Sequence, residues 1–217
     1  MLVTADRRYE GRTVVIAATG PTLTPEVAAE VRAIGAPIAV VSDAWRLFPE
    51  AGILWSTDLV WWRLHAQALG AFAGERWSSQ GPYPGNDKSR ERQALGLNLI
   101  EGRTEGRRFS TDPAYIHHGY NSGYAALNLV LLMGARRIVL VGYDMQLGPG
   151  GRRHFFGNHP PGLHNGDASR FAQWFEHSAS SIPAGVTVEC GTPSALRCFK
   201  QVDLADLQRP KNSPASR

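Results

Sequence analysis

Three apolar stretches near the start of the chain each end in small hydroxyl or acidic residues, and the start of a helix follows each one. The stretches cover residues 13–18, 37–41 and 52–55, and the helices expected after them cover residues 25–34, 44–47 and 59–69. A nearly continuous apolar run is typical of a strand that is buried on both faces of a parallel sheet. The repeated strand-helix order therefore predicts an α/β chain with a right-handed, Rossmann-like, mostly parallel sheet and helices on both faces.

The helix starts carry recognisable capping residues. Thr24-Pro25-Glu26 combines an N-cap, a proline at the first helical position and an acid in the first turn, and Gly35 ends that helix. Asp43 and Asp58 stand where they would cap the next two helices. These signals place the helix boundaries more firmly than apolar periodicity alone.

The second half of the chain repeats the pattern. We expect helices over residues 122–133, 168–180 and 194–199, and strands over 137–142 and 186–190. Between them and the first part, periodicity weakens over about residues 71–113, where only 97–100 resembles a strand. We interpret residues 1–207 as one nucleotide-binding domain, with an insertion at 71–113 that acts as a lid and a flexible tail at 208–217.

Composition narrows the class of protein. The hydrophobic fraction of 43% and the charged fraction of 19% are ordinary for a globular domain. The start of the chain lacks the apolar segment of a secretory signal, so we expect a cytoplasmic protein with no membrane partner. The net charge of +4 permits contact with phosphates or nucleic acid without requiring it. Cys190 and Cys198 are too few for a disulfide framework.

Two short turns with glycine precede helix starts, and both follow the pattern of an anion site. Helix N-termini present free N–H groups and a positive dipole end, which favour a phosphate. Neither turn matches the GxGxxG or Walker patterns. An ordinary turn or N-cap would explain each one singly, whereas two such turns at the same edge of a sheet favour a nucleotide. We therefore expect nucleotide contacts from Thr19, Gly20, Pro21, Thr22, Ser42, Asp43, Asn121, Ser122 and Gly123.

Three acids, Asp43, Asp58 and Asp144, directly follow predicted strands. Converging carboxylates hold Mg²⁺ against a pyrophosphate in many enzymes. Helix capping explains the first two better than metal binding does, while Asp144 precedes no obvious helix and is the better functional candidate. We expect no required metal, with Asp58 and Asp144 as the alternative Mg²⁺ ligands.

The loop after the strand at 137–142 is rich in histidine and arginine. His154, His159 and His164 are candidate general bases, because the ordinary pKa of histidine lies near working pH. Arg152 and Arg153 are candidates for neutralising a departing phosphate. The five-residue spacing of the histidines is not a zinc pattern.

These pieces together resemble a loose superfamily with two branches. One contains small bacterial sialyltransferases with a GT-A-related domain; the other contains proteins related to 6-hydroxymethylpterin pyrophosphokinase, including uncharacterised phage proteins. Gly20-Pro21-Thr22-Leu23 resembles the family's Gly-Pro-Ser-Leu turn, and Asn121-Ser122-Gly123 its Ser-Gly helix start. The strand GARRIVLVGYDM resembles the family's Gly-x-Asp strand end, and the loop with His154 its histidine-bearing loop.

The sialyltransferase resemblance implies that one loop histidine is the base and that Gly20, Thr22, Ser42, Ser122 and Gly123 contact the nucleotide. The family's phosphate-binding tyrosines are absent after Asp144, and Arg152 and Arg153 would take their place. The pyrophosphokinase resemblance implies Mg²⁺ on Asp58 and Asp144, although Val60 stands where that branch has a second acid.

Our leading hypothesis is a transferase that moves a sugar from a nucleotide-activated donor to an unidentified acceptor, such as a glycan or modified DNA. The alternatives are a Mg²⁺-dependent pyrophosphokinase of the hydroxymethylpterin type and a non-catalytic phage accessory protein that binds nucleotide or nucleic acid. Asp144 and the loop histidines are the catalytic candidates in the first case.

Overall fold

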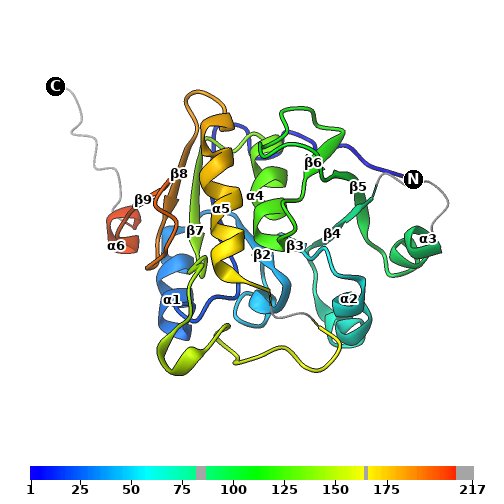
Figure 1. Cartoon of the computed structure of the whole chain (residues 1–217), viewed down its shortest axis with the longest axis horizontal. Helices are drawn as coiled ribbons and strands as arrows, with labels where there is room; N and C mark the ends of the chain where they lie inside the picture. The colour runs from blue at the N-terminus through cyan, green and yellow to red at the C-terminus, as the bar shows by residue number, and fades with distance from the viewer. Residues whose placement is uncertain (82–86, 164–165, 209–217) are drawn as a thin grey trace.

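The computed structural model describes residues 1–81, 87–163 and 166–208, and these residues contain one nine-stranded sheet in which every neighbouring pair is parallel (Figure 1). The strand order is β6-β5-β4-β3-β2-β1-β7-β8-β9. The strands are β1 (Thr13–Ala17), β2 (Ile38–Val41), β3 (Ile53–Trp55), β4 (Glu75–Gln80), β5 (Asn98–Arg103), β6 (Tyr115–His117), β7 (Arg137–Val141), β8 (Thr187–Cys190) and β9 (Lys200–Gln201). The expected α/β class is confirmed.

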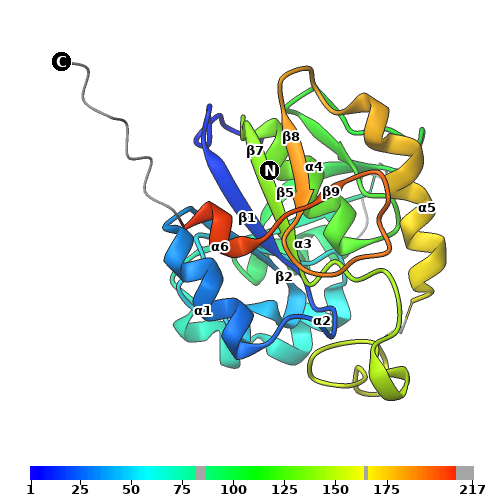
Figure 2. The same ribbon diagram turned by 90° about the vertical axis from the view of Figure 1, so that its left-hand side faces the viewer.

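Helices cover both faces of this sheet, as Figure 2 shows with the sheet between two helical layers. The α-helices are α1 (Pro25–Ile34), α2 (Leu59–His65), α3 (Asp87–Ala94), α4 (Ser122–Leu132), α5 (Ala168–Ser178) and α6 (Leu204–Leu207). Short 3₁₀ helices are η1 (Ser42–Arg46), η2 (Ala68–Ala71), η3 (Pro149–Gly151) and η4 (Ala179–Ser181).

Alternate residues of the central strands belong to two separate hydrophobic cores, one on each face of the sheet. Val14 and Ile16 of β1 pack with α4 and α5, whereas Val15 and Ala17 pack with α1, α2 and α6. Side chains alternate across a strand, so a strand that is apolar at every position suits a sheet covered on both faces. This is why residues 13–17 form an uninterrupted apolar run.

The chain reverses its direction across the sheet between β1 and β7. From β1 it proceeds outward through β2, β3, β4 and β5 to β6, and α4 then returns it to β7 on the other side of β1. In open parallel sheets, such a reversal leaves a crevice at the carboxyl ends of the strands, where ligands bind. The fold therefore places a crevice beside the residues that follow β1 and β7.

Helix α4 lies fully inside the molecule. Every residue from Gly123 to Leu132 is buried. The Asn128 side chain accepts hydrogen bonds from the backbone N–H groups of Ser110 (3.0 Å) and His117 (2.9 Å) and donates one to the Ser110 carbonyl (3.1 Å). A helix that is apolar all round has to be enclosed, and here the sheet and the segment before β6 enclose it.

The segment at residues 71–113 differs from the expectation of an inserted lid. It supplies β4 and β5 to the sheet, together with α3, although only residues 97–100 resembled a strand. The β4 sequence ERWSSQ alternates polar and apolar residues too weakly to stand out. β4 lies between β3 and β5 and is only partly buried, which allows that composition.

The helix expected over residues 194–199 is absent from the described structure. Backbone N–H groups there bind elsewhere: Ala195 donates to the Asp144 carbonyl (2.8 Å), and Arg197 donates to the Glu176 carboxylate (2.7 Å). Because these backbone N–H groups donate hydrogen bonds to other parts of the chain, they are not available for the hydrogen bonds of a helix within the segment. Of the predicted tail, only Gln208 lies within the described residues.

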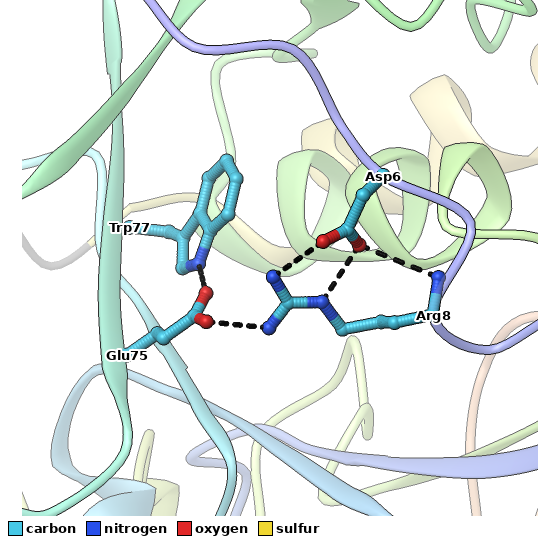
Figure 3. A network of polar contacts seen from close by, with 4 residues as sticks. All are labelled: Asp6, Arg8, Glu75 and Trp77. Atoms are coloured by element: carbon cyan, nitrogen blue, oxygen red, sulfur yellow. Dashed lines mark hydrogen bonds and ion pairs between the residues drawn. The ribbon is translucent and has the colours of Figure 1, made fainter.

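The N-terminal segment crosses the edge of the sheet opposite the crevice, where the strands begin. Arg8 donates to both oxygens of Asp6 (2.7 Å each) and to Glu75 (2.6 Å), and Glu75 accepts the indole N–H of Trp77 (2.7 Å), as Figure 3 shows. The Val3 N–H also donates to the Leu99 carbonyl (2.8 Å). These contacts tie the chain start to β4 and β5.

Within the described ranges, no helix combines the length and apolar character that a bilayer crossing needs.

Candidate functional site

A cavity of about 800 Å³ opens at the carboxyl ends of the strands, beside the reversal between β1 and β7. Its walls come from the residues that follow β1, β2, β3, β6 and β7, from the long loop after β7 and from the first turns of α5. In Figure 1 this loop runs below the strands toward α5. The location is the one expected for a ligand site in this fold.

Most of the site residues expected from sequence meet at this cavity. Those that line it are Thr19, Gly20, Ser42, Asp58, Asn121, Ser122, Gly123, Asp144, Arg153, His154 and His159. Four others lie within the described chain but outside the lining: Pro21, Thr22, Asp43 and Arg152. His164 lies outside the described residues.

The glycine turn after β1 holds a carboxylate of the protein itself. Asp144 accepts the Thr22 backbone N–H at Oδ1 (2.9 Å) and the Thr22 hydroxyl at Oδ2 (2.8 Å). The Gly20 N–H donates to the Gly142 carbonyl (2.8 Å). The expected phosphate cradle at Gly20–Thr22 is thus occupied in this structure by Asp144.

Gly20 is glycine for a steric reason. A Cβ at this position would lie 1.9 Å from Asp144 Oδ2 and 2.5 Å from the Gly142 carbonyl oxygen. Burial raises the pKa of Asp144, and its hydrogen bonds to Thr22 oppose that shift only in part. Asp144 therefore links the turn after β1 to the end of β7.

The start of α4 is a better anion site than the first turn. Asn121 caps it by accepting the Tyr124 N–H (2.9 Å), and the Ser122 hydroxyl oxygen accepts the Thr57 N–H (3.1 Å). The first N–H groups of a helix have no partner within it. Asn121, Ser122 and Gly123 all line the cavity, so this positive helix end faces it.

A second helix start, that of α5, borders the same cavity with two arginines. Asp167 caps α5 by accepting the Ser169 N–H (3.0 Å), and Arg153 donates to the Gly166 carbonyl (2.8 Å) just before it. Arg153 and Arg170 line the cavity. Two helix starts and two guanidinium groups make this wall favourable for a phosphate.

His154 and His159 form a pair of rings in the lining of the same cavity. His154 Nδ1 lies 2.9 Å from the Thr19 hydroxyl in a hydrogen bond, and the two ring centroids are 4.4 Å apart. The His154 ring also stacks on Phe156 at 5.0 Å. Burial, aided by the nearby His159, lowers the pKa of His154 to about 4, and burial also lowers the pKa of His159. Both rings are therefore neutral at pH 7 and able to accept a proton.

Asp43 does not cap a helix, so that prediction is wrong. It lies inside η1, where Val41 holds the N-cap position without a side-chain bond. Its buried carboxylate accepts the Trp61 indole N–H (2.7 Å) and pairs with Arg46 (2.6 Å). Trp61 of α2 and Arg46 of η1 itself occupy the Asp43 carboxylate, which lies outside the cavity lining, so the expected nucleotide contact from Asp43 is not seen.

Three residues in strained backbone conformations line the cavity together. Ser42 (φ 46°), Tyr120 (φ 54°) and Met145 (φ 51°) are the non-glycine residues with positive φ in the described part of the chain. Such conformations cost about 1–3 kcal/mol each and concentrate at ligand sites. Their gathering around one cavity makes it the candidate ligand site of the described residues.

The two alternative Mg²⁺ ligands, Asp58 and Asp144, both line the cavity, but both carboxylates already accept hydrogen bonds from the protein. Asp58 caps α2 by accepting the Val60 N–H (2.7 Å), and both oxygens of Asp144 bind Thr22. Among the described residues, no group of three His, Cys, Asp or Glu side chains comes together as a metal site would require. The donor set therefore fits a resident metal poorly.

Several residues that line the cavity were not predicted from the sequence, among them Tyr120, Arg170 and Trp174. Tyr120 stands directly before the predicted Asn121-Ser122-Gly123 turn, so its proximity to the site was available from the sequence. Arg170 and Trp174 lie on α5, whose approach to α4 depends on tertiary packing. No local pattern indicates that approach.

No family model matches the chain, and no curated protein matches it. A solved structure, that of the uncharacterized protein lmo2446 from Listeria monocytogenes EGD-e, is similar at 11% identity with a TM-score of 0.22. That similarity covers 92% of this chain and 23% of the Listeria chain. At this TM-score it carries no argument about fold or function.

Proposed function

We propose that the protein is a transferase that takes a nucleotide-activated sugar as donor and a hydroxyl group as acceptor. The observation that carries the proposal is the presence of an anion-favouring helix start, that of α4, and the neutral His154–His159 pair in the lining of one cavity. A donor of this kind needs a site for its phosphates and a base for the acceptor. The cavity offers both.

The departing nucleotide phosphate would rest against the starts of α4 and α5. N–H groups at helix starts and the guanidinium groups of Arg153 and Arg170 stabilise the negative charge that grows as the sugar leaves. The two helix starts are held before the ligand arrives, since Asn121 and Asp167 cap them, and the hydrogen bond to the Gly166 carbonyl holds Arg153. Preorganised donors lower the barrier without reorganising during the reaction.

His154 is our choice for the base. Its bond to Thr19 fixes the ring, and burial keeps the imidazole neutral and ready to take a proton from the acceptor hydroxyl. A bound phosphate nearby would raise the His154 pKa from about 4 toward neutrality, because an anion favours the protonated imidazolium. Donor binding thereby prepares His154 as a better base.

Pyrophosphoryl transfer with Mg²⁺ is the less favoured alternative, because Asp58 and Asp144 are engaged in capping α2 and binding Thr22. Calorimetry with CMP, UDP and ATP, each with and without Mg²⁺, separates the two activities. Metal-independent binding of CMP or UDP supports the sugar transferase. Binding of ATP alone, and only with Mg²⁺, rejects it.

Histidine variants test the catalytic role. We expect His154→Ala to lower turnover of a bound nucleotide-sugar by roughly 10²–10⁴-fold, the usual contribution of a general base. His177→Ala is the matched control, because His177 is exposed on α5 and lies outside the cavity lining. Salt-sensitive DNA binding without turnover of any nucleotide-sugar would instead indicate the non-catalytic alternative.

A further inference from the structure

Beside the start of α4, the cavity has an aromatic wall made by Tyr120 and Trp174. Both side chains line the cavity, and their ring centroids are 5.5 Å apart. Tyr120 is 57% exposed, whereas Trp174 is half-buried on α5. The Arg107 guanidinium lies over the Trp174 ring at 5.5 Å and helps to hold it.

Folding alone gives no reason for a tyrosine at position 120. Its backbone has a φ of 54°, a region that a bulky residue rarely occupies and that glycine accepts freely. More than half of the residue remains exposed, so the burial of apolar surface offsets little of the backbone strain. An exposed aromatic side chain held in a strained turn at the rim of a cavity has the character of a binding residue.

Local contacts nevertheless fix the position of the Tyr120 ring. Its backbone N–H donates to His118 Nδ1 (3.3 Å), and the rings of His118 and Tyr120 meet edge to face at 5.3 Å. The Asn121 N–H donates to the His118 carbonyl (3.0 Å), which closes the turn. The ring is thus presented to the cavity before any ligand arrives.

We propose that Tyr120 and Trp174 bind the base of the nucleotide by stacking, while its phosphate rests at the start of α4. This inference depends on the proposed function, and it adds which part of the ligand meets which wall. Ser122 follows Tyr120 by two positions, so the phosphate site and the aromatic wall adjoin each other along the chain. Stacking of a base on an aromatic side chain contributes substantially to affinity and tolerates any base.

The test compares ligands with and without a base. Calorimetric titrations use CMP and UDP on one side, and pyrophosphate and ribose 5-phosphate on the other. Tyr120→Ala should weaken nucleotide binding by roughly tenfold to a hundredfold and change binding of the base-free ligands less than about threefold. Tyr120→Phe should retain nucleotide affinity, because the aromatic face remains. Tyr115→Ala is the control, since Tyr115 lies outside the cavity lining.

Tyr120→Gly separates binding from folding. Glycine relieves the positive φ, so this variant should be at least as stable as the native protein toward urea while losing nucleotide affinity as Tyr120→Ala does. Unchanged nucleotide affinity in both variants, or equal losses for base-free ligands, would overturn the stacking role but leave the proposed function standing. A loss confined to ribose 5-phosphate or pyrophosphate would also overturn it. Absence of nucleotide and pyrophosphate binding by the native protein would overturn both.

Discussion

Gly20, Thr22 and Asp144 show how single residues join two strand ends beside the cavity. The Asp144 carboxylate occupies the turn after β1 through two hydrogen bonds from Thr22, and Gly20 leaves the space that this carboxylate needs. Buried carboxylates are retained only when such bonds compensate for lost hydration. The turn that resembled a phosphate site thus joins β1 to β7.

Gly20→Ala should destabilise the protein, because the added methyl group would overlap Asp144 Oδ2. We expect a loss of about 1–3 kcal/mol in the free energy of unfolding, the usual cost of overpacking. Urea unfolding followed by tryptophan fluorescence measures it. Gly70→Ala is the matched control, since a Cβ at Gly70 meets nothing within 4 Å. Equal stability of the two variants would contradict the steric argument.

His154 should make stability depend on pH in the acid range. Its pKa in the folded protein is about 4, below its ordinary value of 6.5, so the folded state prefers the neutral ring. Its contribution is fully present above pH 6.5 and is lost as pH falls toward 4. The loss is at most about 3 kcal/mol and smaller after solvent screening.

His154→Gln should therefore reduce the fall in unfolding free energy between pH 6.5 and 4. His177→Gln, at an exposed position outside the cavity lining, is the comparison variant. Chemical denaturation at several pH values provides the measurement. An identical pH profile for His154→Gln and the native protein would show that the ring is not held in its neutral form.

At the scale of elements, α4 links the core to the cavity. Its body is buried from Gly123 to Leu132, while its first residues line the cavity. The Asn128 side chain holds the helix in place because it forms hydrogen bonds with the backbone of both Ser110 and His117. A rigid, buried helix is a precise support for a phosphate site at its N-terminus.

Asn128→Ala should cost about 2–4 kcal/mol, because it leaves buried backbone groups of Ser110 and His117 without partners. Thermal and urea unfolding report the loss. Gln173→Ala, on the exposed face of α5, is expected to stay within about 0.5 kcal/mol of the native protein. A comparably small effect of Asn128→Ala would mean that water satisfies those groups.

At the scale of the whole molecule, the sequence is informative about the central strands and less so about the periphery. The runs at β1, β2 and β7 are apolar because both faces of those strands are buried, so the pattern reveals them. β4 is partly exposed and mixes charged and apolar residues, and β6 has three residues. Neither carries a periodic signal.

The residues of the candidate site likewise fall into those that a local sequence pattern predicts and those whose contacts it does not predict. Asn121, Ser122 and Gly123 were recognisable because helix starts have local chemistry. Tertiary partners decided the rest: Thr22 turned toward Asp144, and Asp43 toward Trp61. Such long-range pairings leave no trace in residue spacing, so the sequence located the cavity better than it assigned its contacts.

A crystal structure of the protein soaked with CMP or UDP tests the central claim most directly. The account predicts a nucleotide in the cavity beside the reversal between β1 and β7, with its phosphate against the first N–H groups of α4. A nucleotide bound elsewhere on the protein, or a phosphate remote from Ser122 and Gly123, would contradict it.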